Sequence, residues 1–346
     1  MRVLLDTTYT RRGASGTGVY IVRLMQALAE LGVEVVEAQN PARRTPGGGG
    51  RRSALNASAD VAWTTIELPR RARTVGADLI HHPLPAWSPV AGVPQVITVH
   101  DLAFVRLPEA FDSAFRRVAS VTHRAAARRA DAVICVSQTT AMDVRARWGV
   151  APERIVIAPH GPGQVVKPGR TADDGLGHHL LYVGDDEPRK NLPLLLTSHR
   201  RLRAQQNAVP PLVLAGSARP AREPHDDVRV VDRPGTDELA ALLADAVALV
   251  LPSRYEGFGL TALEAMAAGV PVIAARAPGL TETCGDAAAY VDPYDAQNLA
   301  DVIARVTGDA ALRADLAGRG RRRAAQFTWA RSARAHVQAY NLALDG

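Results

Sequence analysis

The chain of 346 residues lacks the features that mark several specialised classes of protein. It has no apolar run near the roughly 20 residues that a membrane-spanning helix requires. Strand-like sequence begins at Arg2, so we expect no signal peptide. The only two cysteines, Cys135 and Cys284, lie far apart. A disulfide framework is therefore not expected, and a reducing cytoplasm is the natural location of the protein.

Metal-binding patterns are missing as well. No set of His, Cys and acidic residues has the spacing of a zinc site, and no Asp-x-Asp triplet occurs. We therefore expect no resident metal, and we expect no nucleic-acid partner. With aromatic residues at 5% and an ordinary apolar content, the composition is that of a soluble globular protein.

Lysine is absent from residues 1–165, yet this half of the chain is basic. It contains 20 Arg against 13 acidic residues, whereas the remainder contains 21 basic and 22 acidic residues. A basic N-terminal half favours an anionic partner on that side, such as a membrane surface, a lipid phosphate or an acidic glycan.

A helix expected over 110–129 concentrates part of this charge. Arg117, Arg124 and Arg128 share one of its faces, with Phe111, Phe115 and Val118 as apolar partners. Such a basic amphipathic helix can lie on an anionic membrane. The alternative is an ordinary solvated surface helix.

Strand-like and helix-like patterns alternate along the chain, which is typical of α/β architecture with parallel sheets. The Gly- and Pro-rich stretch 161–178 indicates a linker between two domains, and residues 46–52 lack periodicity and are expected to form a mobile loop. Residues 278–282 are expected to form a loop after a strand. The expected strands are 2–6, 33–37, 78–81, 95–99, 131–135, 154–158, 179–183, 211–215, 228–231, 247–251, 271–275 and 288–291, and the expected helices are 18–31, 110–129, 138–148, 190–206, 236–244, 260–268, 295–306, 309–325 and 328–343.

The most informative segment runs from Pro252 to Gly269. Apolar runs precede and follow it, so it predicts a strand–loop–helix–strand unit of a parallel sheet. Ligands of such sheets bind beyond the carboxyl ends of the strands, where this loop would lie. Gly257 and Gly259 allow the backbone to approach a ligand closely. The amides from Phe258 to Ala262 would open the helix, and helix N-terminal amides are a natural phosphate site.

Two glutamates, Glu256 and Glu264, stand eight residues apart in this segment and could accept hydrogen bonds from sugar hydroxyls. A glutamate near a helix start is also favourable through the helix dipole alone, which is the purely structural alternative.

A second candidate segment, Tyr182 to Leu192, follows the first strand of the second half. Arg189 and Lys190 in it could neutralise a leaving diphosphate, since negative charge accumulates there in the transition state. The structural alternative is a pair of solvated side chains at a helix start.

In the first half, His100 ends a strand and could bind a sugar hydroxyl, whereas Asp101 could cap the following turn. Gly16 and Gly18 precede an amphipathic helix in a pattern that could be mistaken for a dinucleotide fingerprint. Ile21 stands where the third glycine would be, and some ten residues separate Gly16 from the preceding strand, so we reject that assignment.

Taken together, these segments resemble the retaining nucleotide-sugar glycosyltransferases of family 4, which have the GT-B fold. The resemblance is carried by the Glu-x7-Glu segment, by the Gly-Val-Pro-Val strand after it, by the Glu-Pro-Arg-Lys-Asn segment 187–191 and by the His-Asp pair at 100–101. It implies two facing Rossmann-like domains with a central cleft. Residues 1–165 would form the acceptor-side domain, residues 166–327 the donor-binding domain, and a helix within 328–346 would cross back to the first domain.

The resemblance also implies roles for individual residues. Arg189 and Lys190 would stabilise the departing diphosphate, Glu256 would hold the donor sugar and Glu264 the ribose. His100 would orient the transferred sugar. The remaining donor contacts are implied in the glycine loops, at Gly16, Gly18, Gly257, Phe258, Gly259, Leu260 and Thr261.

The implied reaction moves a hexose, with mannose as our guess, from a GDP- or UDP-linked donor to a hydroxyl group, with retention at the anomeric carbon. The acceptor would be a glycan, a lipid-linked sugar or a small molecule, as in cell-envelope polysaccharide biosynthesis at the inner face of the membrane. No cofactor other than the donor is implied, because the Asp-x-Asp motif of metal-dependent glycosyltransferases is missing. The alternatives are an epimerase or phosphorylase-like enzyme on the same fold, and a non-catalytic glycan-binding module.

This sequence departs from the family pattern at two positions. Asp185 stands where some members have an arginine, and Thr261 stands where many have a proline. Donation from the backbone amide at position 261 should survive the second change.

Overall fold

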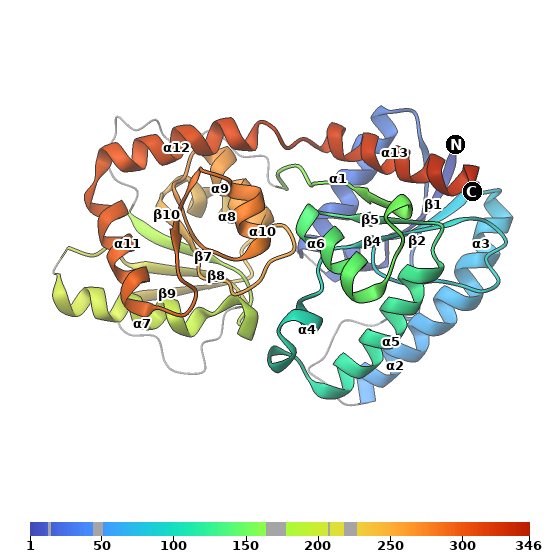
Figure 1. Ribbon diagram of the computed structural model, residues 1–346, viewed down its shortest axis with the longest axis horizontal. Helices are drawn as coiled ribbons and strands as arrows, with labels where there is room; N and C mark the ends of the chain where they lie inside the picture. Colours follow the sequence, from blue (N-terminus) through green and yellow to red (C-terminus); the bar gives the residue numbers. More distant parts are fainter. Residues whose placement is uncertain (13–14, 44–50, 164–177, 207, 218–226) are drawn as a thin grey trace. The chain divides into compact units, whose positions relative to one another are not determined.

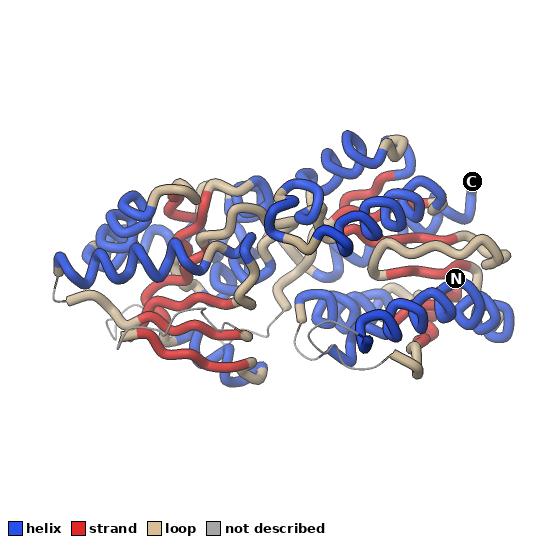
Figure 2. Tube along the Cα trace, turned by 90° about the horizontal axis from the view of Figure 1, so that it is seen from below, coloured by secondary structure: helices blue, strands red, loops and turns tan. Residues whose placement is uncertain are grey.

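The computed structural model describes residues 1–12, 15–43, 51–163, 178–206, 208–217 and 227–346. Within them the chain divides into two compact units. Unit 1 comprises Met1–Val105, Asp112–Gly161 and Trp329–Gly346, and unit 2 comprises Arg106–Phe111 and Pro162–Thr328. Each unit contains a six-stranded parallel sheet, whose strands are drawn in red in Figure 2. Most of the predicted linker 161–178 lies outside the described residues.

The sheet of unit 1 is fully parallel, as the alternating pattern predicted. Its strand order reverses between β1 and β3, which makes that point the topological switch of the sheet. In spatial order the strands are β2 (Glu34–Ala38), β1 (Arg2–Asp6), β3 (Leu79–His82), β4 (Gln95–Val99), β5 (Ala132–Cys135) and β6 (Ile155–Ile157).

One face of this sheet is covered by α1 (Gly16–Glu30) and α13 (Trp329–Asp345). Tyr20 of α1 and Tyr340 of α13 are fully buried in the same apolar cluster. Figure 1 shows α13, drawn in red, lying along the strands of unit 1 beside α1. The last helix therefore returns to the N-terminal unit, as the family resemblance implied.

The other face is covered by the π-helical turn η2 (Trp63–Glu67) and by α3 (Leu68–Val75), which continue directly from α2 (Arg51–Ala62). Trp63 and Leu68 pack against the sheet residue Leu4. No helix was predicted here, and the predicted loop included Arg51 and Arg52, which instead begin α2; both predictions are wrong. Residues 46–50 of that loop lie outside the described part of the chain. Because Pro69 and the β-branched residues before it weaken the helical pattern, packing on the sheet decides the outcome.

The remaining described helices of the first 160 residues follow the strands of this sheet. They are η1 (Thr8–Arg12), α4 (Ala103–Arg106), η3 (Pro108–Ala110), α5 (Ser113–Arg129), α6 (Gln138–Asp143), η4 (Val144–Trp148) and η5 (Pro152–Arg154). The segment Arg106–Phe111 clusters with unit 2, which the sequence did not predict.

The sheet of unit 2 is also fully parallel, and its order reverses between β7 and β10. Numbered within the unit, the order is 3-2-1-4-5-6, that of a dinucleotide-binding Rossmann fold. In spatial order the strands are β9 (Val228–Asp232), β8 (Leu212–Gly216), β7 (His179–Val183), β10 (Ala246–Leu251), β11 (Val272–Ala275) and β12 (Ala288–Val291).

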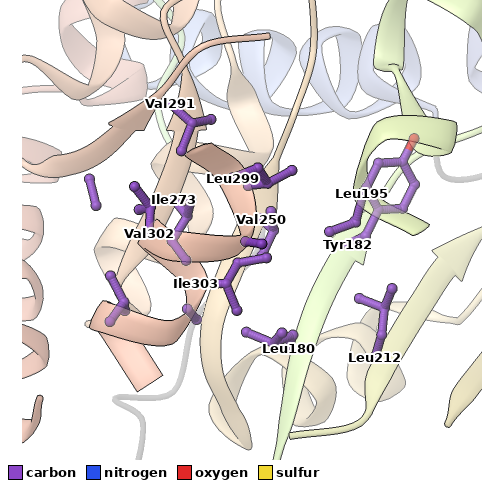
Figure 3. Close-up of a cluster of buried hydrophobic side chains, with 14 of the residues drawn as sticks. Leu180, Tyr182, Leu195, Leu212, Val250, Ile273, Val291, Leu299, Val302 and Ile303 are labelled. Atoms are coloured by element: carbon purple, nitrogen blue, oxygen red, sulfur yellow. The ribbon is translucent and has the colours of Figure 1, made fainter. Parts of the chain in front are cut away.

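The core of unit 2 lies between one face of this sheet and the helices α7 (Leu192–Gln205) and α11 (Ala296–Gly308). Figure 3 shows Tyr182 beside Leu195 of α7, and Val250 near Leu299 and Ile303 of α11. These side chains anchor the strands whose carboxyl ends carry the candidate site. The other helices that the structure describes in this unit are η7 (Pro188–Lys190), α8 (Thr236–Ala244), α9 (Leu260–Ala268), α10 (Pro278–Cys284) and α12 (Ala310–Ala324).

All expected strands form, each within one residue of its predicted bounds. The expected loop 278–282 is instead the start of α10, because Pro278 occupies the first turn, where proline favours a helix. Among the described residues, no helix combines the length and apolar character needed to cross a bilayer.

Candidate functional site

A cluster of charged side chains lies at the switch point of unit 2. Arg189 and Lys190 follow β7, and Glu256 follows β10, the neighbouring strand on the other side of the switch. Lys190 Nζ donates to Glu256 Oε1 at 2.6 Å, and Arg189 Nη1 donates to Glu256 Oε2 at 3.0 Å. Arg189 Nε also donates to Glu187 at 2.7 Å. The site thus joins two cations from one loop to a carboxylate from another.

The environment of Glu256 keeps it ionised. Burial alone would raise the pKa of this carboxyl, but Lys190 and Arg189, with hydrogen bonds from Lys190 and Ser253, lower the pKa to about 2. Ser253 Oγ contributes a 2.8 Å bond to Oε1. Glu256 therefore carries no proton to donate at neutral pH, which agrees with its interpretation as a hydrogen-bond acceptor.

Hydrogen bonds from neighbouring residues fix the loop after β7 against the loop after β10. Asn191, in a left-handed conformation with φ of 58°, donates through Nδ2 to the carbonyls of Pro252 and Pro293 at 3.2 and 2.8 Å. The backbone N–H of Arg254 donates to the carbonyl of Arg189 at 2.8 Å. These bonds couple the carboxyl ends of β7 and β10 directly, so the cations and the carboxylate are positioned together.

Asp185 acts in the same loop after β7. Its Oδ1 accepts from the backbone N–H of Ser217 at 3.1 Å and also from the Ser217 hydroxyl. Asp185 therefore ties the loop after β7 to the loop after β8.

The glycine turn after β10 leads directly into α9. Gly259 precedes the helix with φ of 94°, a conformation that favours glycine. Gly257 and Phe258 are buried, whereas Gly259, Leu260 and Thr261 are half-buried at the start of the helix. Amides at such a position are suited to a phosphate group.

Glu264 lies one turn into α9 and is buried. Gly279 of α10 packs against the turn that carries Glu256, since a Cβ atom at Gly279 would lie 2.1 Å from the Glu256 carbonyl oxygen. The first turn of α10 therefore packs directly against the backbone of the turn that carries Glu256.

We expect Gly279→Ala to lower the free energy of unfolding of unit 2 by about 1–3 kcal/mol or more. The added methyl group would clash with the backbone carbonyl of Glu256, and a backbone atom cannot shift as easily as a side chain. Urea unfolding followed by circular dichroism measures the change. Gly308→Ala, at the end of α11 with no heavy atom within 4 Å of the added Cβ, serves as a control and should be neutral or slightly stabilising. Equal stability of the two variants would contradict the packing described for α10.

Unit 1 has a pocket at its own switch point, between the ends of β1 and β3, with a volume of about 80 Å³. Asp6, at the end of β1, accepts hydrogen bonds from Trp63 Nε1 at 3.1 Å and from the backbone N–H of Thr8 at 3.0 Å. His82 lines the pocket from the end of β3, and His123 lines it from α5. Trp63 lines it as well, and none of Asp6, Trp63, His82 and His123 was among the sequence candidates. The strand-end positions of Asp6 and His82 were the available signal.

Buried rings link α13 to the sheet of unit 1. The Tyr20 hydroxyl lies 2.8 Å from Thr98 Oγ1 and 2.8 Å from His336 Nε2, and the Tyr340 hydroxyl lies 2.9 Å from His81 Nδ1. These bonds connect α1, β3, β4 and α13 in one network, so the returning helix is held by polar contacts as well as by apolar packing.

His100 lies beside this network, edge-on to Tyr20 with ring centroids 4.8 Å apart. Its Nε2 donates to the carbonyl of Pro83 at 3.0 Å, which places the proton of the neutral ring on Nε2. Burial lowers the pKa of His100 although Asp101 opposes the shift. Asp101 Oδ1 accepts from the backbone N–H of Ala103 at 2.9 Å, so the predicted capping role of Asp101 is confirmed.

Comparison with known proteins identifies the family. A family model described as Glycosyltransferase Family 4 matches residues 14–161, and one described as Glycosyl transferases group 1 matches residues 175–323. A D-inositol 3-phosphate glycosyltransferase of Pseudarthrobacter chlorophenolicus is 30% identical, with 96% of this chain and 91% of that protein covered. The chain belongs to glycosyltransferase family 4.

Two further proteins are similar to this glycosyltransferase. O-antigen chain mannosyltransferase B of Escherichia coli is 29% identical over 77% of this chain and 74% of that protein. The crystal structure of sucrose-phosphate synthase from Thermosynechococcus elongatus superposes with a TM-score of 0.79 at 23% identity, covering 99% and 98% of the two chains. The predicted GT-B class, with two Rossmann-like units, is confirmed.

The structure brings part of the predicted site together. Arg189, Lys190 and Glu256 form one cluster, and the run from Gly257 to Glu264 continues from it along the turn and α9. With side chains of Arg189 and Lys190 only 15% and 16% exposed, the alternative of two solvated cations is wrong. The roles of these residues toward a donor stay predictions.

The other predicted positions, His100, Gly16 and Gly18, belong to unit 1. The helix was expected to begin at Gly18, with Gly16 in the loop before it, but both glycines lie in the first turn of α1. Ser15 caps that turn, since its hydroxyl accepts a hydrogen bond from the backbone N–H of Gly18 at 3.1 Å. With this cap the helix begins at Gly16, two residues before the expected start at residue 18. The predicted contact of these glycines with the donor stays a prediction.

The buried histidines predict a pH dependence for unit 1. Burial is the main reason why the pKa of His336 falls to about 4 and that of His81 well below its usual range. In the unfolded chain these groups titrate near pH 6.5, so the unfolded state takes up protons first as the pH falls. We expect the free energy of unfolding to decrease from about pH 6.5 to about pH 4, by up to about 1.4 kcal/mol per pH unit for each such histidine.

Tryptophan fluorescence measures this effect selectively, because all four tryptophans of the chain, Trp63, Trp87, Trp148 and Trp329, belong to unit 1. His336→Gln should make the pH dependence shallower, whereas His178→Gln, at an exposed position of unit 2, should leave it unchanged. Stability that stays constant between about pH 7 and about pH 5 would exclude the mechanism.

Proposed function

We propose that this glycosyltransferase moves a hexosyl unit from a nucleoside diphosphate sugar to a hydroxyl group, with retention at the anomeric carbon. The cluster of Arg189, Lys190 and Glu256 at the switch point of unit 2, beside the start of α9, is the observation that carries the proposal. In open parallel sheets, ligands bind at such a point.

The departing diphosphate is stabilised by Lys190, Arg189 and the amides of Gly259 to Thr261. Each ammonium group has three N–H donors, and Lys190 gives one of them to Glu256, which orients the side chain without neutralising its capacity to bind an anion. The half-buried position strengthens the interaction because water screens it less. Glu256 accepts from the donor sugar, and Glu264 accepts from the ribose.

The same residues make a metal ion or other cofactor unnecessary for departure of the diphosphate. Two cations and a helix N-terminus supply the positive potential that a divalent ion would otherwise provide. Turnover should therefore persist in EDTA, and dependence on an added divalent ion would contradict this part of the proposal.

The acceptor hydroxyl binds in unit 1. The pocket at the β1–β3 switch point offers the Asp6 carboxylate, the His82 ring and the Trp63 indole, a set suited to hydroxyl groups. His100 orients the transferred sugar. A mannosyl donor and a glycan acceptor are supported by the relative named O-antigen chain mannosyltransferase B, and a role in cell-envelope polysaccharide synthesis follows from the same likeness.

A thermal-shift panel of GDP, UDP, GDP-mannose and UDP-glucose tests the proposal, followed by transfer assays with the donor that stabilises the chain most. Glu264→Ala should reduce the thermal shift by nucleotide, because a hydrogen bond to the ribose is lost. NMR of the product would show retained anomeric configuration. Epimerised sugar formed from donor alone, or binding of glycan without any nucleotide, would point to a different function.

A further inference from the structure

The outward face of α5 in unit 1 is the strongest surface feature that the proposed function does not use. Val118 and Val121 are 62% and 67% exposed there. Arg117, Arg124 and Arg128 are exposed on the same side, while Ala119, Ala126 and Ala127 face the interior. At 100° per residue the three arginines and the two valines fall within about 120° of the helix circumference.

The charge on this face is of one sign. From Ser113 to Arg129 the helix contains no acidic residue. Within the part of the chain that the structure describes, Arg117, Arg124 and Arg128 form no ion pair. Their charge is therefore available to an external anion, and their aliphatic stems can lie along the apolar stripe.

We infer that the outward face of α5 docks unit 1 on an anionic lipid surface. Exposed valines between arginines are suited to the boundary between headgroups and acyl chains, where the apolar side chains are buried and the guanidinium groups meet phosphate. A nucleic acid would use the arginines and leave the valines in water. A protein interface would be expected to carry aromatic residues or methionine at its centre, whereas this face has valines among arginines.

The same helix connects this surface to the pocket of unit 1. His123, on the inner side of α5, lines the pocket, while Val121 and Arg124 lie on the outer side. A helix with its side chains is about 10–12 Å across. Docking would thus hold the pocket roughly one helix diameter from the lipid headgroups, within reach of a hydroxyl on a lipid-linked acceptor.

Sedimentation with vesicles tests the docking without using enzymatic activity. The full chain should bind vesicles of phosphatidylcholine with 30% phosphatidylglycerol, should not bind phosphatidylcholine alone, and should dissociate as salt is raised. Replacing Arg117, Arg124 and Arg128 with Gln should weaken binding by roughly a hundredfold, since each arginine contributes roughly a factor of five. Val118→Ser with Val121→Ser should also weaken it, without removing any charge.

A matched control removes three exposed arginines of unit 2, by Arg200→Gln, Arg201→Gln and Arg305→Gln, and should leave vesicle binding unchanged. Far-UV circular dichroism and the thermal shift by GDP or UDP confirm that each variant is folded. The inference is overturned if the α5 variants bind anionic vesicles as tightly as the parent chain does, or if the control variant weakens vesicle binding by the same factor. It is also overturned if the parent chain does not bind anionic vesicles. Loss of self-association on Val118→Ser and Val121→Ser, with no vesicle binding, would assign the face to a second copy of the chain.

Discussion

Replacing Lys190 with alanine is expected to lower the turnover number of the transferase by roughly a hundred- to a thousandfold, the usual effect of removing one donor to developing negative charge. The side chain is 16% exposed and held by Glu256 at 2.6 Å, so its charge acts in a partly dehydrated site. Release of GDP or UDP from the donor sugar measures the effect, with or without acceptor.

Two further variants make this result specific. Lys190→Arg keeps the positive charge and should retain more activity than Lys190→Ala. Arg200→Ala removes a cation from an exposed position of α7 and should leave turnover unchanged. If Lys190→Ala turns over as fast as the parent chain, Lys190 does not stabilise the leaving group.

Glu256→Ala is expected to have the largest effect on stability. It leaves Arg189 and Lys190 half-buried without their shared carboxylate, and breaking such a buried pair by removing one partner costs about 3–5 kcal/mol. Transfer should be lost as well, because the cations lose their orientation. The loss should fall on unit 2, so circular dichroism should report it and tryptophan fluorescence, which reports unit 1, should not.

Glu256→Gln distinguishes charge from hydrogen bonding. The amide oxygen can still accept from Lys190 and Ser253, so part of the stability should return. Nucleotide binding should persist, since the cluster becomes more positive, while transfer should stay low. Full activity in Glu256→Gln would show that the negative charge at this position is not needed.

Much of this fold could be predicted because parallel strands buried on both faces form unmistakable apolar runs. β10 and β11 are fully buried along their length, and both were found within one residue of their bounds. Prediction failed where the local pattern was weak. The segment 51–75 was missed because Thr64, Thr65, Ile66 and Pro69 interrupt its helical propensity, and α10 has just seven residues, two of them Pro278 and Gly279.

In the candidate site, too, contiguous residues could be predicted and pairs distant in the sequence could not. Gly257 to Glu264 could be predicted as a unit because they are contiguous, and a strand–turn–helix places its own residues. The pairing of Glu256 with Lys190 could not, since 66 residues separate them. Asp6 and Trp63 are 57 residues apart and meet only because η2 crosses the end of β1. No local spacing encodes such pairs.

The sequence by itself determined the α/β class, the strand bounds, the glycine turn before α9 and the presence of a cation pair after β7, because each depends on short-range periodicity or on adjacent residues. Only the tertiary structure decided which strands are neighbours, and thereby that Glu256 meets Arg189 and Lys190 at one switch point while Asp6 and His82 line a pocket at the other. The physical reason is that strand order follows from the packing of whole helices on a sheet, a sum of long-range contacts that no single segment contains.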